Sequence, residues 1–352
     1  MGSNLKIEDG DIVNNWYIIC LSQELKMNSI LKRTVYDQDF VVYRDVNEKP
    51  VVLIDRCIHR GVQLSKGRSE KGEIVCPYHG WKYGVNGQVT EIPSEKNPNL
   101  KNLCGITFPV IEKSGAIWIW TGDKNKVTET PSWTFPYYGA KNWTSYFMVT
   151  DFENEVNHLV QNFMDVPHTV FVHSKWFRNR KLMKVPIEIT VDSGRVLVKY
   201  VQSKDSIGFV GFILNPKNNP MIHTDEFIFP NITRVDYLFG NQHFIINSQC
   251  TPISKGRTRV YTWICYHLGF IGFLLKPFMQ YYTRKVITQD VEIMENHGVN
   301  LKKEPSFFNL SNYRNTSADE LHIAIEKLRS QGKEDKDSIM KINYKKEREF
   351  WI

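Results

Sequence analysis

Two short segments of the sequence each pair a cysteine with a histidine at a spacing that suits metal binding. Cys57 and His59 are separated by one residue, and Cys76 and His79 are separated by two. Sixteen residues lie between the two segments. Thiolate sulfur and imidazole nitrogen are protein ligands for zinc and for iron–sulfur clusters. The four side chains therefore form a candidate metal site.

The sequence around these segments predicts how the four side chains are brought together. The apolar run Val51–Ile54 predicts a strand leading into Cys57, and Glu73–Val75 predicts a second short strand ending at Cys76. Further along, Asn86-Gly87 predicts a hairpin turn. We therefore expect an antiparallel β module that presents the two segments on two loops.

The order of the ligands distinguishes two kinds of metal site. Zinc fingers usually place two cysteines on one loop and two histidines on the other, whereas each loop here carries one of each. A mixed arrangement suits a Rieske-type [2Fe–2S] cluster, in which two histidines replace two thiolates on one iron. The sequence favours the cluster, and a structural zinc module is the alternative.

The two segments, CIHRG and CPYHGW, resemble the Rieske signature of the ring-hydroxylating oxygenases, including Arg60-Gly61 and Gly80-Trp81. Respiratory-chain Rieske proteins carry a further cysteine in each loop and a serine, where this chain has Val62, Tyr78 and Trp81. Fewer hydroxyl donors to sulfur predict a potential toward the low end of the Rieske range of roughly −150 to +300 mV. Such a potential suits electron delivery to an iron–oxygen centre.

A second group of candidate ligands lies in residues 162–173, NFMDVPHTVFVH. His168 and His173 are five residues apart, which is about 140° around an ideal helix, so they cannot converge from a straight one. They converge if the first lies at a helix end and the second on the turn beyond. Pro167 is compatible with such an irregularity.

Two histidines and one carboxylate on one face of iron leave positions open for dioxygen and substrate. The stretch Thr288–Glu292 is the best source of the carboxylate, and its Asp290 falls beside a predicted helical stripe of Val286, Ile287, Ile293 and Met294. An isolated carboxylate there would be costly without a partner. A surface helix that carries several acids is the alternative interpretation.

Residues 162–173 resemble the Asn-x-x-Asp-x-x-His-x4-His pattern of Rieske non-haem iron oxygenases. The resemblance implies that a mononuclear Fe(II) is bound by His168, His173 and Asp290. The three-residue step from Asn162 to Asp165 is more similar to the monooxygenase and demethylase branch than to the two-subunit arene dioxygenases.

The same resemblance implies roles for two further residues. Asp165 would hydrogen-bond His168 and also His79 of the partner subunit in a homotrimer, so that it bridges the two metal centres. Asn162 would lie near the iron. A helix-capping or surface position is the alternative for Asp165, and a structural amide is the alternative for Asn162.

The resemblance extends from Asn15 to Asp290 and implies an α+β fold, in which an antiparallel β Rieske domain is joined to a helix-grip (START-like) catalytic domain. We expect the Rieske [2Fe–2S] domain over residues 1–125 and the catalytic domain with the mononuclear iron over residues 126–352. Alternating segments between residues 187 and 266 predict strands. Ser317 and Glu320 predict a capping box for a later helix. The charged tail that follows is expected to be solvated, and its aromatic end to dock on the body or on another subunit.

These features together predict a terminal oxygenase component that hydroxylates or oxidatively demethylates a hydrophobic small-molecule substrate with O2. No dinucleotide-binding fingerprint and no plant-type ferredoxin cysteine run occur in the sequence, so electrons must come from a separate reductase or ferredoxin. The alternative is a non-catalytic Rieske electron-transfer protein, which would hold the cluster but no mononuclear iron.

The composition bears on partners and location. The chain has 352 residues and a net charge of +7 at pH 7, too mild for a dedicated nucleic-acid surface. No leader or membrane-spanning segment is evident, and we expect a cytoplasmic protein. The four remaining cysteines are expected to be buried free thiols: Cys20, Cys104, Cys250 and Cys265.

Two further segments have alternative interpretations. A basic cluster interleaved with aromatic residues is either a docking surface for an acidic electron donor or a solvated face: Lys175, Trp176, Phe177, Arg178, Arg180, Lys181 and Lys184. The apolar segments 209–214 and 270–275 either wall a substrate pocket or pack in the core.

Overall fold

The computed structural model describes residues 12–128, 130–131, 133–174, 176, 184–201, 208–303 and 313–351. Contacts divide the chain into two compact units, Met1–Thr134 and Phe135–Ile352. The expected domains, 1–125 and 126–352, meet a few residues before this division, and their assignment stays a prediction. Each unit is described by itself below.

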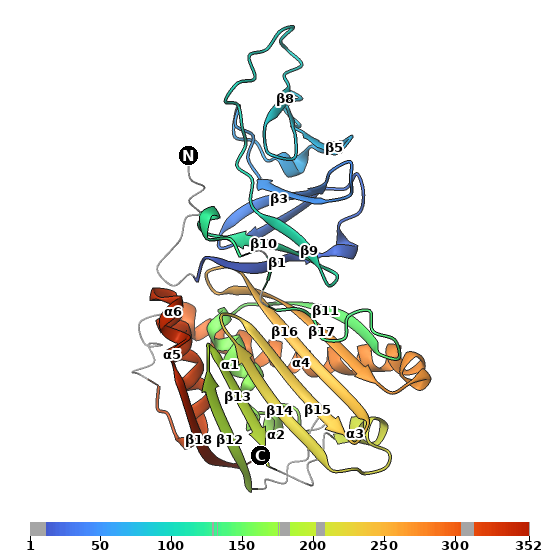
Figure 1. Ribbon diagram of the computed structural model, residues 1–352, viewed down its shortest axis with the longest axis vertical. Coiled ribbons are helices and arrows are strands. Elements are labelled where there is room, and N and C mark those ends of the chain that lie inside the picture. Colours follow the sequence, from blue (N-terminus) through green and yellow to red (C-terminus); the bar gives the residue numbers. More distant parts are fainter. Residues whose placement is uncertain are drawn as a thin grey trace. The chain divides into compact units, whose positions relative to one another are not determined.

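The first unit consists of three antiparallel sheets and short 3-10 turns (Figure 1). In the order in which they pair, the strands of the three sheets are β1 (Asn15–Leu21), β10 (Ala116–Thr121) and β9 (Val110–Lys113); β2 (Leu31–Val35), β3 (Gln38–Arg44) and β4 (Pro50–Ile54); and β5 (Arg68–Glu70), β6 (Glu73–Val75), β7 (Lys82–Tyr83) and β8 (Val89–Glu91). The 3-10 turns are η1 (Ser22–Glu24), η2 (Leu64–Lys66) and η3 (Lys124–Lys126).

The two strands predicted to flank the cysteine loops are confirmed as β4 and β6. The predicted hairpin turn is confirmed as well, because β7 and β8 pair across it and Gly87 adopts a φ of +80°. A Cβ at Gly87 would lie 2.3 Å from the carbonyl oxygen of Gly105, so this turn also needs a residue without a side chain. The β module therefore forms as its local sequence predicts.

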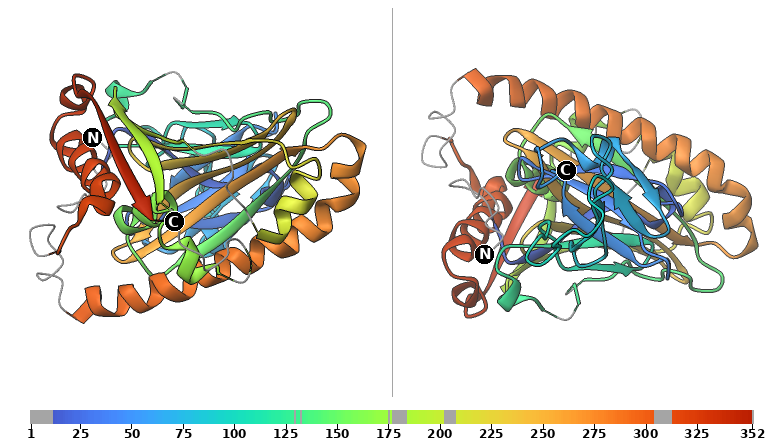
Figure 2. Two further views of the ribbon diagram at one scale, coloured as in Figure 1. Left: turned by 90° about the horizontal axis from the view of Figure 1, so that it is seen from below. Right: turned by 90° about the horizontal axis from the view of Figure 1, so that it is seen from above.

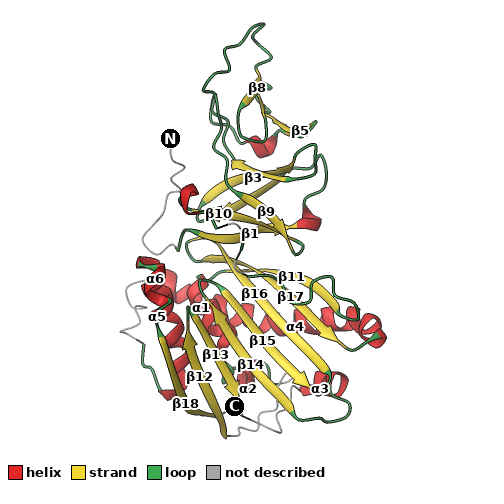
Figure 3. Cartoon of the chain, in the orientation of Figure 1, coloured by secondary structure: helices red, strands yellow, loops and turns green. Residues whose placement is uncertain are grey.

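The second unit is built on one antiparallel sheet of eight strands (Figures 1 and 3). In the order in which they pair, the strands are β11 (Thr144–Phe152), β17 (Arg257–His267), β16 (Gln242–Ser254), β15 (Ile232–Phe239), β14 (Met221–Ile228), β13 (Arg195–Tyr200), β12 (Lys184–Asp192) and β18 (Asn343–Trp351). Buried and accessible residues alternate along β12, as expected for a sheet with one face in the core.

A long helix lies across one face of this sheet (Figure 2). This helix, α4 (Phe270–Lys303), has 34 residues, and its Met279 and Tyr282 are buried in the core between helix and sheet. The other helices are α1 (Val156–Met164), α2 (Thr169–Val172), α3 (Gly208–Leu214), α5 (Glu320–Glu334) and α6 (Lys336–Ile339). The expected strands between residues 187 and 266 are confirmed, apart from α3, which is helical.

One glycine allows α4 to approach the chain that follows β11. A Cβ at Gly298 would lie 2.1 Å from the backbone carbonyl oxygen of Glu153, closer than any real side chain could be. The amide of the next residue, Asn154, donates to the backbone carbonyl of Met294 at 2.8 Å on the same helix. The position of α4 against the sheet therefore depends on a residue without a side chain.

Two predictions near the end of the chain are wrong. The capping box is formed by Thr316 and Asp319 rather than by Ser317 and Glu320, because a 3-10 turn, η6 (Ser317–Asp319), precedes α5. Asp319 accepts from the backbone amide of Thr316 at 2.6 Å. The charged tail is not simply solvated, since it forms β18 and pairs along the full length of β12.

The cysteines away from the two loops differ in exposure. Three are buried as expected, and burial raises the pKa of each thiol to about 12: Cys20, Cys250 and Cys265. The prediction is wrong for Cys104, which is exposed. Within the described part of the chain, no helix combines the length and apolar character needed to cross a bilayer.

Candidate functional site

The two cysteine loops have the same backbone hydrogen bonds. The amide of Cys57 donates to the carbonyl of Val62 at 2.8 Å, and the amide of Cys76 donates to that of Trp81 at 2.9 Å. In each loop, the glycine four residues after the cysteine donates back to the cysteine carbonyl, and Gly61 and Gly80 have φ values of +76° and +71°. The two loops are therefore equivalent turns, each closed by a glycine in the left-handed region.

The four candidate ligands separate into a buried pair and an outer pair. Cys57 and Cys76 are each 2% exposed, whereas His59 is half-buried and His79 is exposed. The imidazole centroids of His59 and His79 lie 4.7 Å apart, and His59 stacks on Trp81 at 4.6 Å. Two inner thiols and two adjacent outer imidazoles form a donor set that fits a [2Fe–2S] cluster of Rieske type.

A tyrosine that the sequence analysis missed contacts this site. The hydroxyl of Tyr83 lies 3.0 Å from Cys57 Sγ and accepts a hydrogen bond from the amide of Ile58 at 3.1 Å. Because its oxygen is already an acceptor, its proton is free to point at the sulfur, and burial raises the pKa of this phenol. The ligand sulfur therefore has one hydroxyl donor that the loop motif does not reveal.

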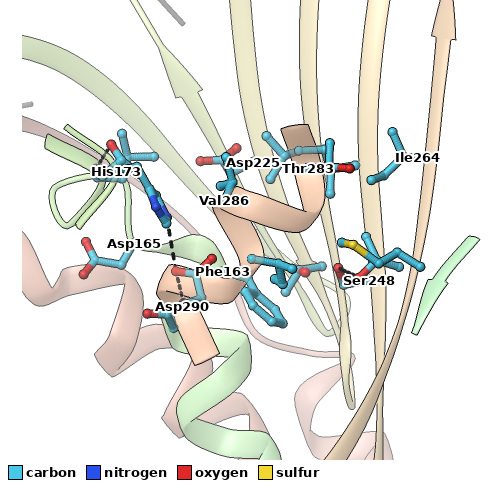
Figure 4. Close-up of a pocket in the computed structure, with 18 of the residues that line it drawn as sticks. Phe163, Asp165, His173, Asp225, Ser248, Ile264, Thr283, Val286 and Asp290 are labelled. Atoms are coloured by element: carbon cyan, nitrogen blue, oxygen red, sulfur yellow. Dashed lines mark hydrogen bonds and ion pairs between the residues drawn. The ribbon is translucent and has the colours of Figure 1, made fainter. Parts of the chain in front are cut away.

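The second candidate site brings together three side chains from separate places in the chain. His168 directly precedes the one-turn helix α2, His173 directly follows it, and Asp290 lies on α4. Their ligand atoms all lie within 4.8 Å of one another. Nε2 of His168 lies 3.4 Å from Oδ1 of Asp290. Nε2 of His173 lies 3.1 Å from the same oxygen (Figure 4). The two histidines therefore converge across a short helical turn rather than along a straight helix.

The three groups are held in an environment with little water. Asp290 is 6% exposed and His173 is 3% exposed. Burial by itself would raise the pKa of Asp290, but hydrogen bonds from His168 and His173 hold it well below its usual range. Burial would lower the pKa of His168, yet Asp290 and then Asp165 raise it above its ordinary value. The arrangement therefore favours a carboxylate that is balanced by positive charge.

Neighbouring amides orient two of these groups. Nδ1 of His173 lies 2.9 Å from Oε1 of Gln289, which can only accept, so Nδ1 carries a proton; Nε2 becomes a lone-pair donor when it gives up its own proton to bind a metal. Asn162 is buried on α1 and donates to Oδ1 of Asp290 at 3.2 Å. Asn162 thus contacts the trio, and its place near an iron stays a prediction; Gln289 is a positioning residue that the sequence analysis missed.

Asp165 lies at the end of α1 and beside the trio. Its Oδ2 is 3.8 Å from Nδ1 of His168, too long for a hydrogen bond, and 3.9 Å from Nε2 of His322 on α5. The side chain of Asp165 is 25% exposed. Asp165 therefore has access both to the candidate metal site and to solvent, and its bridging role stays a prediction.

The remaining histidines contact other groups. His158 is half-buried against His297, with ring centroids 4.7 Å apart, and desolvation, followed by the effect of His297, lowers its pKa to about 3. His243 pairs with Asp236 at 2.8 Å, and His267 contacts the carbonyl of Asn241 at 3.2 Å. Most of the predicted basic docking cluster lies outside the described residues, which include only its Trp176 and Lys184.

A cavity of about 130 Å³, partly open to solvent, leads to the trio. It lies between the sheet and the helices α1 and α4, and its walls are mostly apolar, with Met148, Tyr237, Phe244 and Ile264 among them. Figure 4 shows His173 and Asp290 at one side of this cavity and Ser248 and Ile264 at the other. None of the described side chains of residues 211–214 and 271–275 lines it; Leu214 is in the core, and Ile271, Phe273 and Leu274 are exposed.

The donor set of the second site fits a mononuclear iron. Two imidazole nitrogens and one carboxylate oxygen that converge from one side form the arrangement used by non-haem Fe(II) oxygenases. The opposite side opens into the cavity, whose lining includes all three side chains. Coordination positions for small molecules would therefore face the space in which a substrate fits.

Comparison with known proteins identifies the first unit. Residues 15–109 match the family described as the Rieske [2Fe–2S] domain. The chain thus contains a Rieske domain, which implies a [2Fe–2S] cluster, as the cysteine and histidine spacing predicted.

Two relatives are similar to this chain over about half of its length. Chlorophyllide a oxygenase of Chlamydomonas reinhardtii, a chloroplast protein, is 31% identical over 175 residues, which are 50% of this chain and 26% of that protein. The oxygenase component of dicamba O-demethylase from Stenotrophomonas maltophilia is 31% identical over 186 residues, covering 52% of this chain and 54% of that protein. The matches thus span from about a quarter to about half of these relatives' length.

The crystal structure of dicamba monooxygenase bound to dicamba has the same fold. It superposes with a TM-score of 0.79 at 19% identity and covers 94% of this chain and 100% of that one. The predicted α+β fold, with its antiparallel Rieske domain joined to a helix-grip domain, is confirmed. The homologues and structural neighbours are Rieske oxygenases, so the predicted resemblance is confirmed as well.

Proposed function

We propose that the chain is the terminal oxygenase component of a Rieske non-haem iron system. It would use O2 and electrons from a separate reductase or ferredoxin to hydroxylate or oxidatively demethylate a hydrophobic small molecule. The observation that carries the proposal is the convergence of His168, His173 and Asp290 beside an apolar cavity, in a chain that also has a Rieske domain. A Rieske electron carrier needs no such trio.

Each proposed ligand has a distinct role. Cys57, Cys76, His59 and His79 would hold the cluster, and His168, His173 and Asp290 would hold the mononuclear iron. When bound, the cluster supplies single electrons and the iron supplies the centre at which dioxygen is activated. Gln289 keeps the proton on Nδ1 of His173, so that Nε2 faces the metal position.

The polar groups beside the trio would act on its charge. The amide of Asn162 donates to Oδ1 of Asp290 and so limits which oxygen of this carboxylate is available. Asp165 would connect His168 with His79 of the partner subunit in a homotrimer, and the partial exposure of Asp165 is compatible with this role. The apolar walls of the cavity exclude water from the trio and would bind the body of the substrate.

The names of the relatives are consistent with monooxygenation and demethylation. One of these relatives is a chloroplast protein, so the relatives do not support the predicted cytoplasmic location. The substrate class is a proposal from the cavity rather than from these names. Its walls are apolar apart from a few polar groups, which fits a hydrophobic molecule.

Metal analysis tests the proposal directly. The protein would be purified without oxygen, and iron, sulfide and zinc would be measured per chain. We expect three irons and two sulfides in the wild type, as one [2Fe–2S] cluster and one further iron require. The His173→Ala variant should lose one iron and all substrate oxidation while keeping the visible spectrum of the cluster.

The matched control is His243→Ala, because His243 pairs with Asp236 away from the cavity. This variant should keep three irons. A wild type that holds only the two cluster irons would support the electron-transfer alternative. A colourless protein that contains zinc alone would support the structural zinc module.

A further inference from the structure

A second acid faces the cavity, far from the trio in sequence. Asp225 lies on β14 and is 1% exposed, yet it belongs to the lining of the cavity. Figure 4 shows its carboxylate among the side chains that surround this space. Burying a carboxylate in an apolar wall costs free energy, so the carboxylate needs hydrogen-bond partners that offset its loss of hydration.

Only one oxygen of this carboxylate has a partner in the described part of the chain. Oδ1 of Asp225 lies 2.9 Å from Nε2 of His223, two residues earlier on the same face of β14. Oδ2 is buried and has no hydrogen-bond partner among the described residues. The residues paired with Asp225 on the adjacent strands are Val198 on β13 and Val235 on β15, which have no polar side-chain atoms.

His223 is held in a position in which its ring contacts only one oxygen of Asp225. Its ring is stacked between Tyr200 and Tyr237, with centroids 4.2 and 4.4 Å away. This stacking fixes the direction of Nε2 toward Oδ1 of Asp225. Because Nε2 of His223 contacts Oδ1, Oδ2 is left as an acceptor without a partner among the described residues, in a side chain that lines the cavity.

We propose that Asp225 determines substrate specificity by accepting a hydrogen bond from a hydroxyl or N–H group of the molecule bound in the cavity. This inference rests on the proposed function, because it assigns the same cavity to the substrate. It narrows the substrate class to hydrophobic molecules that carry one such donor. Carboxylates and sulfonates are disfavoured, since they would place an anion against a buried acid.

The test measures binding without turnover, on the full chain loaded with both metal centres and kept free of oxygen and reductant. The probes are 2-naphthol, which carries a hydroxyl donor, 2-methoxynaphthalene, which has none, and 2-naphthoate, which is an anion. Wild type should bind 2-naphthol about tenfold or more tightly than 2-methoxynaphthalene, as a hydrogen bond to a charged acceptor predicts. The anion should bind most weakly.

Two variants separate the acceptor from the rest of the strand. Asp225→Asn keeps the shape, but with His223 donating to the amide oxygen it turns an N–H group toward the cavity. The preference for 2-naphthol should then fall to about twofold or less, and 2-naphthoate should gain affinity. Glu226→Gln is the matched control, because Glu226 is the next residue on β14, lies outside the cavity lining and pairs with Arg195 at 3.0 Å. It should keep the wild-type ratio.

The results overturn the inference in two ways. Equal affinities of the wild type for 2-naphthol and 2-methoxynaphthalene, or no binding of either, would refute it even if Asp225→Asn does not fold. An unchanged ratio in a folded Asp225→Asn variant would also refute it. Failure of the proposed function is a separate result: a chain without the third iron that still shows the ratio would retain the specificity site and lose the oxygenase assignment.

Discussion

Removal of the Tyr83 hydroxyl should lower the reduction potential of the cluster. Tyr83 is fully buried on β7, and its hydroxyl lies 3.0 Å from Cys57 Sγ. A hydrogen bond donated to a ligand sulfur stabilises the reduced cluster, which is more negative, more than the oxidised one. The Tyr83→Phe variant loses this preference while the ring stays in the core.

The size of the effect follows from the charge on the sulfur. A hydrogen bond to a charged group contributes about 1.5–3 kcal/mol. Because the added electron is shared over the whole cluster, we take the difference between the two redox states as about 1 kcal/mol. For a one-electron couple, 59 mV corresponds to about 1.4 kcal/mol, so the potential should fall by roughly 40 mV.

A redox titration followed by electron paramagnetic resonance measures this change on the full chain. The matched control is Tyr43→Phe, because Tyr43 is also buried in the same core and donates to the carbonyl of Gly84 at 3.3 Å rather than to sulfur. Its potential should stay close to that of the wild type. A Tyr83→Phe potential within about 10 mV of the wild type, or a fall of equal size in both variants, would refute the reasoning.

Three further outcomes follow from other contacts. Gln289→Ala should weaken binding of the mononuclear iron by about 10–100-fold in a chelator competition, because His173 loses the partner that orients its ring. Gln280→Ala, at an exposed position of α4, should not weaken it, and equal losses of iron affinity in the two variants would contradict the role given to Gln289. With the cluster bound, a thiol reagent at pH 8 should label Cys104 and spare the three buried thiols, whose pKa values are about 12. Mass spectrometry of the labelled peptides measures the order of labelling, and early labelling of a buried thiol would contradict the prediction. Gly298→Ala should destabilise the second unit by at least about 1–2 kcal/mol in thermal unfolding, since the new methyl group would meet the backbone oxygen of Glu153. Val299→Ala, at the exposed neighbouring position, should change the stability little, and a stabilised Gly298→Ala variant would refute the close approach of α4 to Glu153.

The local parts of both sites could be predicted from the sequence. The two cysteine loops are set by short strands and turn glycines, whose signals lie within a few residues of the ligands. The break before His168 was predicted from Pro167 and from the five-residue step between the histidines. Asp290 was predicted from two observations together: a lone acid beside an apolar stripe needs a partner, and the stretch around it resembles that of the oxygenase family.

The parts that could not be predicted depend on contacts between distant segments. Tyr83 appears in the sequence as one aromatic residue in a two-residue strand, and its contact with Cys57 depends on how the loops fold together. Gln289 differs from other helical amides only because α2 packs beside it. His223 and Asp225 are two residues apart on one strand, but only the closed sheet and helices turn that face into a cavity wall.

The charged edge strand β18 has a consequence for truncation of this protein. The strand lies at one edge of the large sheet, with Lys345, Glu347 and Glu349 at exposed positions and Lys346 and Arg348 at half-buried ones. If it were trimmed away, β12 would be left with unpaired backbone groups beside its row of Val185, Ile187, Ile189 and Val191. An exposed apolar edge strand of this kind can pair with a strand of another molecule, so the truncated protein should aggregate rather than simply lose stability.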